Sequence, residues 1–323
     1  VDKLFEALDD QDEVEDVIAV AFQFRIPTVV DNIYVATPLF KILDMDERII
    51  ATGGTRIEQP FLFDRPPGGS YRGMDTMDIT RRKTKSLIQL EWKQYYSAVS
   101  IDGLTRLRTS GDRAIIDLVD TELQGAELRM KEDLGTDSFL DGTGNFSKTL
   151  DGFAISIAMT GTYGGIARAT DPEGTAVNGN VDTTGGAVTL PAIQTQWGAA
   201  SFGAAHPTLL VTTQVLFNSV WNRIQPQQRF PQGAVAEELA KIGFNVIMFN
   251  GVPLTVDQMC PAGVMLGLNT NFIKLVAHES RADIEVEGPL TPTQQDARTW
   301  RLMWMGNLVH QSPRTSFRMT GLT

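Results

Sequence analysis

The sequence predicts an α+β fold that combines a long β-hairpin, a long helix and a compact α/β domain. Two β-like runs, 49–63 and 84–101, flank a segment rich in turn-forming Gly and Pro. One stretch, 112–141, has the apolar spacing of an amphipathic helix. After Pro191, short strand and helix patterns alternate. The hairpin and the helix are longer than a small core requires, so parts of the chain are predicted to project.

The N-terminal stretch, 1–45, is predicted to be an extended arm. It joins a short acidic amphipathic segment to extended pieces that contain Pro27 and Pro38. Nothing in it predicts a core of its own.

The hairpin, 46–103, is the most informative segment. In its second run Ile88, Leu90 and Trp92 alternate with polar residues, which is the pattern of a half-buried strand. A continuous strand over 88–101 would span roughly 45 Å at about 3.3 Å per residue. Because an isolated two-stranded ribbon is marginal in water, we expect its apolar face to lie against another copy of the chain.

The helix predicted over 112–141 would span roughly 45 Å, long for a globular domain. Asp112 and Asp117 near its start favour the helix dipole, and Gly142 follows its end. Its apolar positions are Ile116, Val119, Leu123, Ala126, Met130 and Leu134. We expect it to act as a structural spine.

The stretch 142–186 is rich in Gly, Thr and Asn and is predicted to be irregular, with a mobile loop at 171–186. Beyond it, Asn250-Gly251 is a strong two-residue hairpin signal between the strands predicted at 243–249 and 252–256. The other predicted elements are a strand at 209–211, helices over 216–224 and 235–242, and strands at 272–277, 282–286 and 300–310.

Composition limits the function classes. With 323 residues, of which 42% are hydrophobic, the chain can fill one large core or two moderate ones. No apolar run approaches the roughly 20 residues that span a bilayer, and no signal-peptide pattern is present, so no membrane partner is expected. The single cysteine, Cys260, excludes an internal disulfide framework.

Charge is distributed unevenly. The net charge of −11 argues against a general nucleic-acid binder. Residues 56–108 nevertheless carry ten bases against six acids, whereas 1–47 carry twelve acids against three bases, and 112–141 nine against three. Each run could be a solvated face. The contrast also fits complementary contact between subunits, with a basic hairpin on an acidic surface.

The sequence predicts no catalytic, cofactor or metal site. The missing motifs do not exclude an enzyme, but they make it the least favoured class, and we expect a non-enzymatic protein. Residues 142–149 superficially resemble a phosphate-binding loop, but Ser147 stands where that motif needs Gly. No nucleophile-elbow motif occurs. His206, His278 and His310 lack the spacing of metal ligands.

Short sequence motifs along 150–322 resemble those of a known family. They include Leu150-Asp-Gly-Phe153, Gly161-Thr-Tyr-Gly-Gly-Ile166 with Arg168, His206-Pro-Thr-Leu-Leu-Val-Thr212 and Cys260-Pro-Ala-Gly263. With the preceding arm, hairpin and helix, the order of these parts resembles the major capsid proteins of tailed bacteriophages, which share the Hong Kong 97-type fold.

The resemblance implies specific roles for these parts. The hairpin 46–103 would be the E-loop, 104–195 with 270–323 the peripheral (P) domain, and 196–269 the axial (A) domain. The chain would assemble with itself into pentamers and hexamers of an icosahedral shell around double-stranded DNA, inside the bacterial host cytoplasm. DNA contact would be weak and non-specific, and scaffolding, portal and decoration proteins would be further partners to test.

Two sets of residues follow as candidates for these roles. The hinge candidates in the hairpin are Gly53, Gly54, Gly68 and Gly69, because glycine tolerates many backbone angles. The candidates for contact between subunits are Arg65, Arg72, Arg81, Arg82, Lys83, Lys85, Trp92, Asp117, Asp120 and Glu127.

Two alternatives remain open on the sequence alone. An encapsulin-type compartment would use the same fold to hold cargo enzymes. A secreted β-rich adhesion protein would explain the Gly/Thr/Asn loops, but it fits poorly with the long helix and the absent signal segment.

Overall fold

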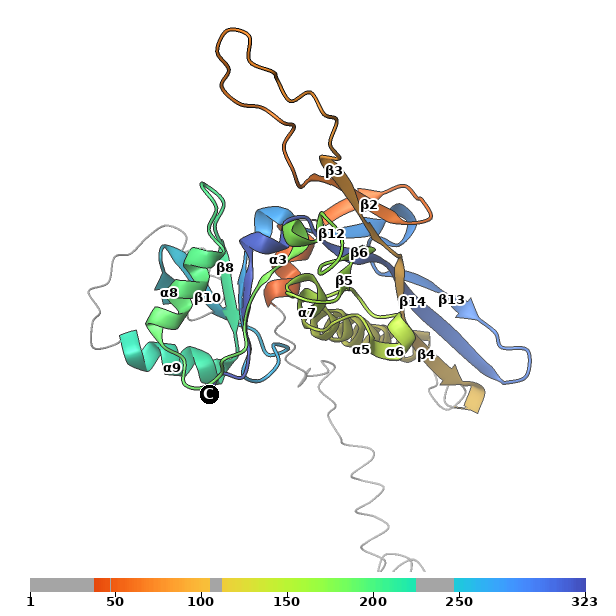
Figure 1. Ribbon diagram of the computed structural model, residues 1–323. Helices are drawn as coiled ribbons and strands as arrows, with labels where there is room; N and C mark the ends of the chain where they lie inside the picture. Colours follow the sequence, from red (N-terminus) through yellow and green to blue (C-terminus); the bar gives the residue numbers. More distant parts are fainter. Residues whose placement is uncertain (1–37, 47, 105–111, 225–246) are drawn as a thin grey trace, which may run out of the picture. The chain divides into compact units, whose positions relative to one another are not determined.

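The computed structural model describes residues 38–46, 48–104, 112–224 and 247–323 (Figure 1), without the side chains of 44–46, 112–118 and 120. The predicted arm up to residue 37 and the helix predicted over 235–242 lie outside these residues. The helices are α3 (Pro38–Asp46), α5 (Asp112–Phe139), α6 (Gly144–Ser147), α7 (Phe153–Ser156), α8 (Leu190–Ala199) and α9 (Gln214–Ile224). The strands are β1 (Arg48–Ala51), β2 (Ile57–Leu62), β3 (Lys85–Leu90), β4 (Lys93–Asp102), β5 (Thr162–Tyr163), β6 (Ile166–Ala167), β7 (Asn180–Asp182), β8 (Leu209–Thr212), β9 (Ile247–Phe249), β10 (Val252–Val256), β11 (Met265–Leu268), β12 (Ile273–His278), β13 (Glu285–Leu290), β14 (Ala297–His310) and β15 (Phe317–Met319).

A five-stranded sheet packs against the long helix α5. Its order is β1-β12-β14-β13, and β4 also pairs with β14, antiparallel from Lys93 opposite Gly306 to Asp102 opposite Ala297. Met130 and Leu134 of α5 are buried in one cluster with Leu302 and Trp304 of β14. This burial confirms the amphipathic spacing that predicted the helix, which begins at Asp112 as expected and ends at Phe139.

A six-stranded sheet, in the order β7-β15-β11-β8-β10-β9, is buried on both faces. Leu210 of β8 packs with α8 and α9, whereas its neighbours Leu209 and Val211 belong to the cluster that contains α5. Successive strand residues point to opposite faces, so both faces need apolar residues. This explains the unbroken apolar run at 209–211, and the predicted strand there is confirmed.

The predicted Asn250-Gly251 hairpin is also confirmed. Asn250 has φ +50° and Gly251 φ +79°, and they join the antiparallel strands β9 and β10. Two positive φ values are what a type I′ turn requires, and Asn-Gly is the pair that adopts them most readily.

The prediction of one continuous strand over 88–101 is wrong, because the run breaks at Glu91-Trp92 into β3 and β4. Trp92 turns its indole N–H to the carbonyl of Gly54 at 2.8 Å. Lys93 is buried and donates to the carbonyl of Ser147 at 2.7 Å. The first half pairs with β2 and the second half joins the five-stranded sheet.

The expectation that another copy covers the apolar face of β3 is wrong as well. Ile88 and Leu90 are buried within the chain, in a cluster with Tyr163, Ile166 and Val177. The 142–186 stretch therefore buries the apolar face of β3. The prediction that this stretch is irregular is wrong in part. Within the predicted mobile loop, β7 pairs in parallel with β15 as an edge strand of the six-stranded sheet.

Candidate subunit interface

The hairpin ends in a loop that carries no strand. The last stem contact joins the Phe63 amide to the Thr84 carbonyl at 3.1 Å. From residue 64 to 83 the chain forms no strand, and Figure 1 shows this loop standing off from β2 and β3. The stem is anchored by Gly164, whose carbonyl accepts a hydrogen bond from the Gln89 amide at 2.9 Å.

The loop exposes large apolar side chains. Met74 and Ile79 are essentially fully exposed, at 104% and 90%, and Tyr71 and Met77 expose 63% and 54%. Four such side chains in one short loop form an apolar surface of the kind that marks an interaction site.

The basic residues predicted for the interface fall into two groups. Arg65, Arg72, Arg81 and Lys85 are exposed and have no ion-pair partner among the described residues. Arg82 and Lys83 are already paired within the chain, Arg82 with Asp78 at 3.1 Å and Lys83 with Glu173 at 2.7 Å. The structure therefore leaves the first group available for another molecule.

The predicted Trp92 site and the hinge glycines lie on or near the stem. Trp92 is half-buried, and its ring and that of His278 form a T-shaped pair with centroids 5.7 Å apart. Gly53 and Gly54 adopt φ of +150° and +124° between β1 and β2, a region that favours glycine. Gly68 and Gly69 lie on the exposed loop, where an added Cβ would meet nothing within 4 Å. Their action as hinges stays a prediction.

The exposed side of α5 is the predicted acidic partner of the hairpin. Glu127 pairs with Lys131 at 2.5 Å, one turn along the helix. Glu122 and Glu132 have no ion-pair partner among the described residues. Asp117 and Asp120 lie on the same helix, but their side chains are outside the described residues.

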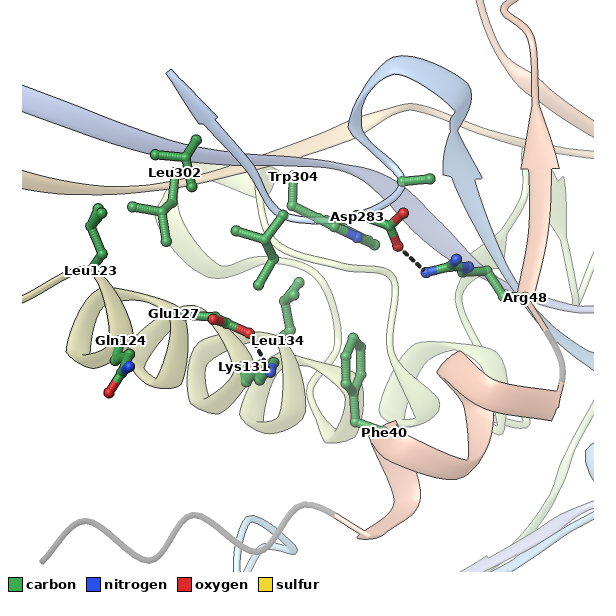
Figure 2. A pocket seen from close by; sticks show the side chains of 13 residues that line it. Phe40, Arg48, Leu123, Gln124, Glu127, Lys131, Leu134, Asp283, Leu302 and Trp304 are labelled. Atoms are coloured by element: carbon green, nitrogen blue, oxygen red, sulfur yellow. Dashed lines mark hydrogen bonds and ion pairs between the residues drawn. The ribbon is translucent and has the colours of Figure 1, made fainter. Parts of the chain in front are cut away.

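A groove of about 490 Å³ lies beside this acidic side, between α5, α3 and the sheet. Figure 2 shows Leu123, Leu134, Leu302, Trp304 and Phe40 around it. Polar residues stand at its rim, where Arg48 donates to Asp283 at 2.9 Å and Lys131 to Glu127. The groove has apolar walls and polar, charged edges, and the residues that line it form no catalytic constellation.

Buried polar groups elsewhere are structural. His310 is fully buried, with Ser156 Oγ 3.4 Å from Nδ1 and Ser316 Oγ 3.2 Å from Nε2. Burial lowers the pKa of His310 to about 3, which keeps the imidazole neutral near pH 7. The buried guanidinium of Arg168 donates to backbone carbonyls, including those of Ile155 and Val177. None of these groups is open to a substrate.

One strained turn follows α5. Asn145, Phe146 and Ser147 have φ of +46°, +59° and +61°, the left-handed region that non-glycine residues avoid. Phe146 is 92% exposed. The Lys93 ammonium holds the turn through the Ser147 carbonyl, and it lies 3.8 Å from the Asp151 carboxylate.

The part of the chain that the structure describes holds neither a metal-ligand cluster nor a membrane-spanning helix. No three His, Cys, Asp or Glu side chains there come together as a metal site. No helix among the same residues is long and apolar enough to cross a membrane.

Comparison with solved structures establishes the fold. The capsid of cyanophage A-1(L) superposes with a TM-score of 0.70 at 15% identity, covering 93% of this chain and 96% of that one. The capsid of a native GTA particle gives a TM-score of 0.62 at 11% identity, over 94% and 99% of the two chains. This chain has the fold of phage capsid proteins. The predicted resemblance is thereby confirmed at the level of the fold.

An encapsulin also has a similar fold. The holo-SrpI encapsulin complex from Synechococcus elongatus PCC 7942 matches with a TM-score of 0.64 at 11% identity, over 95% of both chains. No protein-family model matches the sequence, and no curated protein matches it either.

Sequence reasoning missed the buried polar residues that tie distant segments of the chain together. Glu173, Asn307 and Asp257 are buried polar groups with partners far away in sequence. Little in the sequence indicated these contacts, since each residue is a single polar side chain in a segment without a recognisable motif. A contact with a distant partner produces no repeating pattern in the sequence from which it could be predicted.

Proposed function

We propose that this chain is the major capsid protein of a tailed bacteriophage, a subunit that assembles with itself into an icosahedral shell around double-stranded DNA. The observation that carries the proposal is the match to the cyanophage capsid along nearly the whole of both chains. A structural role agrees with this fold better than a catalytic one does. Assembly would take place in the host cytoplasm, with the protein ending in the virion.

The hairpin would act as the E-loop and clasp a neighbouring subunit. Its loop supports this role by exposing apolar residues such as Met74 and Ile79 beside unpaired bases such as Arg72 and Arg81. The acidic side of α5, with Glu122 and Glu132, would receive these bases, as would Asp117 and Asp120. Permanent interfaces commonly bury about 2,000 Å² or more, and a projecting loop adds area without enlarging the core.

The shell proposal is tested by negative-stain electron microscopy of the purified protein together with light scattering at moderate salt. Closed, uniform shells are expected. If the protein stays monomeric, a co-expressed scaffolding protein is added. Failure to form shells in its presence would overturn the proposal.

The second candidate is an encapsulin-type compartment, which the match to the SrpI complex favours. The contents of shells purified from the native source decide between the two. Double-stranded DNA inside supports the phage capsid, and a co-purifying cargo enzyme without DNA supports the compartment. The net charge of −11 is compatible with both candidates. In a phage capsid, a negative inner surface would repel packaged DNA instead of trapping it.

The acceptor surface is tested separately, by charge exchange. Arg81→Glu should impair assembly, and so should Glu122→Arg combined with Glu132→Arg. If the basic loop meets this side of α5, combining all three substitutions restores part of the assembly yield. Defects that simply add together would place the acceptor elsewhere while leaving the shell proposal intact.

A further inference from the structure

The junction between the hairpin stem and its loop rests on one buried carboxylate. Lys83 Nζ lies 2.7 Å from Glu173 Oε1, and Ser86 Oγ donates to the same oxygen at 2.8 Å. Phe63, on the opposite side of the stem, lies under the Lys83 ammonium with 5.9 Å between charge and ring centroid. Since Phe63 and Thr84 make the last stem hydrogen bond, these contacts sit where the 64–83 loop departs.

Glu173 belongs to the body of the chain and not to the hairpin. It immediately precedes the 3₁₀ turn Gly174–Val177. A Cβ at Gly174 would come within 2.4 Å of the Arg168 carbonyl, so this turn is tightly packed. Val177 in the same turn is buried in the cluster that covers Ile88. The carboxylate is therefore held by a fixed element, whereas Lys83 belongs to the loop.

The two partners differ sharply in exposure. The Glu173 side chain is 8% exposed and that of Lys83 is 62% exposed. Hydrogen bonds from Lys83 and Ser86 hold the pKa of Glu173 below its usual value, so it is charged at neutral pH. A buried charge needs a partner, and Lys83 supplies the opposite charge from the loop side.

The contact is also incomplete. Glu173 Oε2 is buried and receives no hydrogen bond from the described residues. A buried oxygen without a hydrogen bond makes the contact weaker than that of a fully paired carboxylate. Opening would release Lys83 into solvent, where its ammonium is well hydrated, but it would leave the buried Glu173 carboxylate without an opposite charge. The closed contact is therefore favoured in the isolated chain.

We propose that the Lys83–Glu173 ion pair is a latch that sets the direction of the 64–83 loop in the isolated chain, and that its release frees the loop to point elsewhere. In the closed state the ion pair is formed. In the open state the ion pair is broken and the 64–83 loop changes direction at Phe63 and Thr84, while β2 and β3 stay paired. This inference concerns one chain and does not depend on the proposed function.

The experiment measures distances between two spin labels by pulsed electron paramagnetic resonance. One label is placed by Met74→Cys on the loop and the other by Ala98→Cys on β4, both at exposed positions. Native Cys260 is buried and burial raises the pKa of its thiol to about 12, so it does not compete for the label. Labelled chains are diluted with unlabelled ones so that only distances within one chain are read.

The latch variant is Glu173→Gln, and the expected result is a broader or shifted distance distribution than in the doubly labelled parent. Lys83→Met should give the same change, and it keeps the test valid if Glu173→Gln fails to fold, because Lys83 is largely exposed. The double variant should change the distribution no further than either single variant, since both remove one contact.

The matched control is Glu58→Gln, the same substitution at an exposed stem residue. The Glu58 carboxylate accepts a hydrogen bond from Gln89 Nε2 at 3.1 Å, and this contact stays inside the hairpin. It should leave the distribution as in the parent. An unchanged distribution in both latch variants, or equal broadening in the Glu58→Gln control, would overturn the proposal.

Discussion

The Asp257 carboxylate accepts a hydrogen bond from the backbone amide of Leu39, 218 residues away in sequence, at 3.2 Å. Leu39 lies in the first turn of α3, where backbone amides lack partners within the helix. The second carboxylate oxygen accepts from the Met259 amide at 2.8 Å. One buried side chain thus fixes α3 to the loop that follows β10.

The Asp257 contact gives stability a pH dependence. Burial raises the pKa of Asp257 above its ordinary 3.8, so folding favours the protonated form. Its contribution is complete below about pH 4 and is lost as the pH rises through the raised pKa. Relative to Asp257→Asn, which never ionises, the parent should lose free energy of unfolding between pH 4 and 7. Urea titrations of both proteins across this range measure the difference, and an increase would contradict the prediction.

Gly164 should be intolerant of any side chain. A Cβ there would lie 2.3 Å from Ile88 Cγ2, and the backbone has φ +56°. Gly164→Ala should therefore cost about 1–3 kcal/mol more than backbone strain alone, through overpacking. The measurement is the free energy of unfolding by urea.

Gly165→Ala is the control for that strain. Its φ is +81° but an added Cβ would meet nothing within 4 Å, so it bears the left-handed cost of roughly 1–2 kcal/mol without the clash. Equal losses in Gly164→Ala and Gly165→Ala would show that the packing against Ile88 is not tight.

Phe146→Gly should be neutral or stabilising by up to about 1 kcal/mol. Glycine adopts φ +59° without the penalty that Phe incurs, and Phe146 is 92% exposed and buries little. Val215→Gly is the contrast, since Val215 is exposed in the ordinary helix α9 and the change to glycine should cost about 0.3–0.5 kcal/mol. Melting temperatures of the unassembled chain compare the two. A clear loss for Phe146→Gly would argue against the strained turn.

Arg81→Glu should reduce shell yield at least several-fold and leave the melting temperature of the subunit unchanged, because Arg81 has no ion-pair partner among the described residues. Reversal of Arg81, Arg82 and Lys83 together should impair assembly further, but it also breaks the pairs with Asp78 and Glu173. The single substitution is therefore the cleaner measurement, read by sedimentation. Lys148→Glu, at an exposed base outside the hairpin, is the control. Normal yield from Arg81→Glu would argue against docking through the basic loop.

Local sequence patterns correctly predicted two kinds of element. One kind has buried residues at regular spacing, and the other is joined by a turn that only a few residue pairs adopt. α5 followed from apolar spacing, and β9 and β10 from Asn250-Gly251, because each signal lies within a few residues. Strand 282–286 was placed too early, since a 3₁₀ turn at Glu279–Arg281 comes first and β13 begins at Glu285.

The errors arose where a distant segment decided the outcome. Alternating Ile88 and Leu90 correctly indicated a half-buried strand, but the pattern does not say what covers the apolar face. Tyr163 and Val177 cover it from a stretch that was expected to be irregular. In the same way, the basic cluster showed its charge but not that Lys83 was already paired with Glu173.

Strand β14 is the common member of its sheet, pairing with β4, β12 and β13, and β15 joins β7 to β11 in the other sheet. Both strands lie within 297–319, so neither sheet is complete while the ribosome is still making the segments before them. The apolar faces of β4 and α5 therefore stay partly uncovered until β14 has been made. Translation of 297–319 is thus the step that completes both sheets.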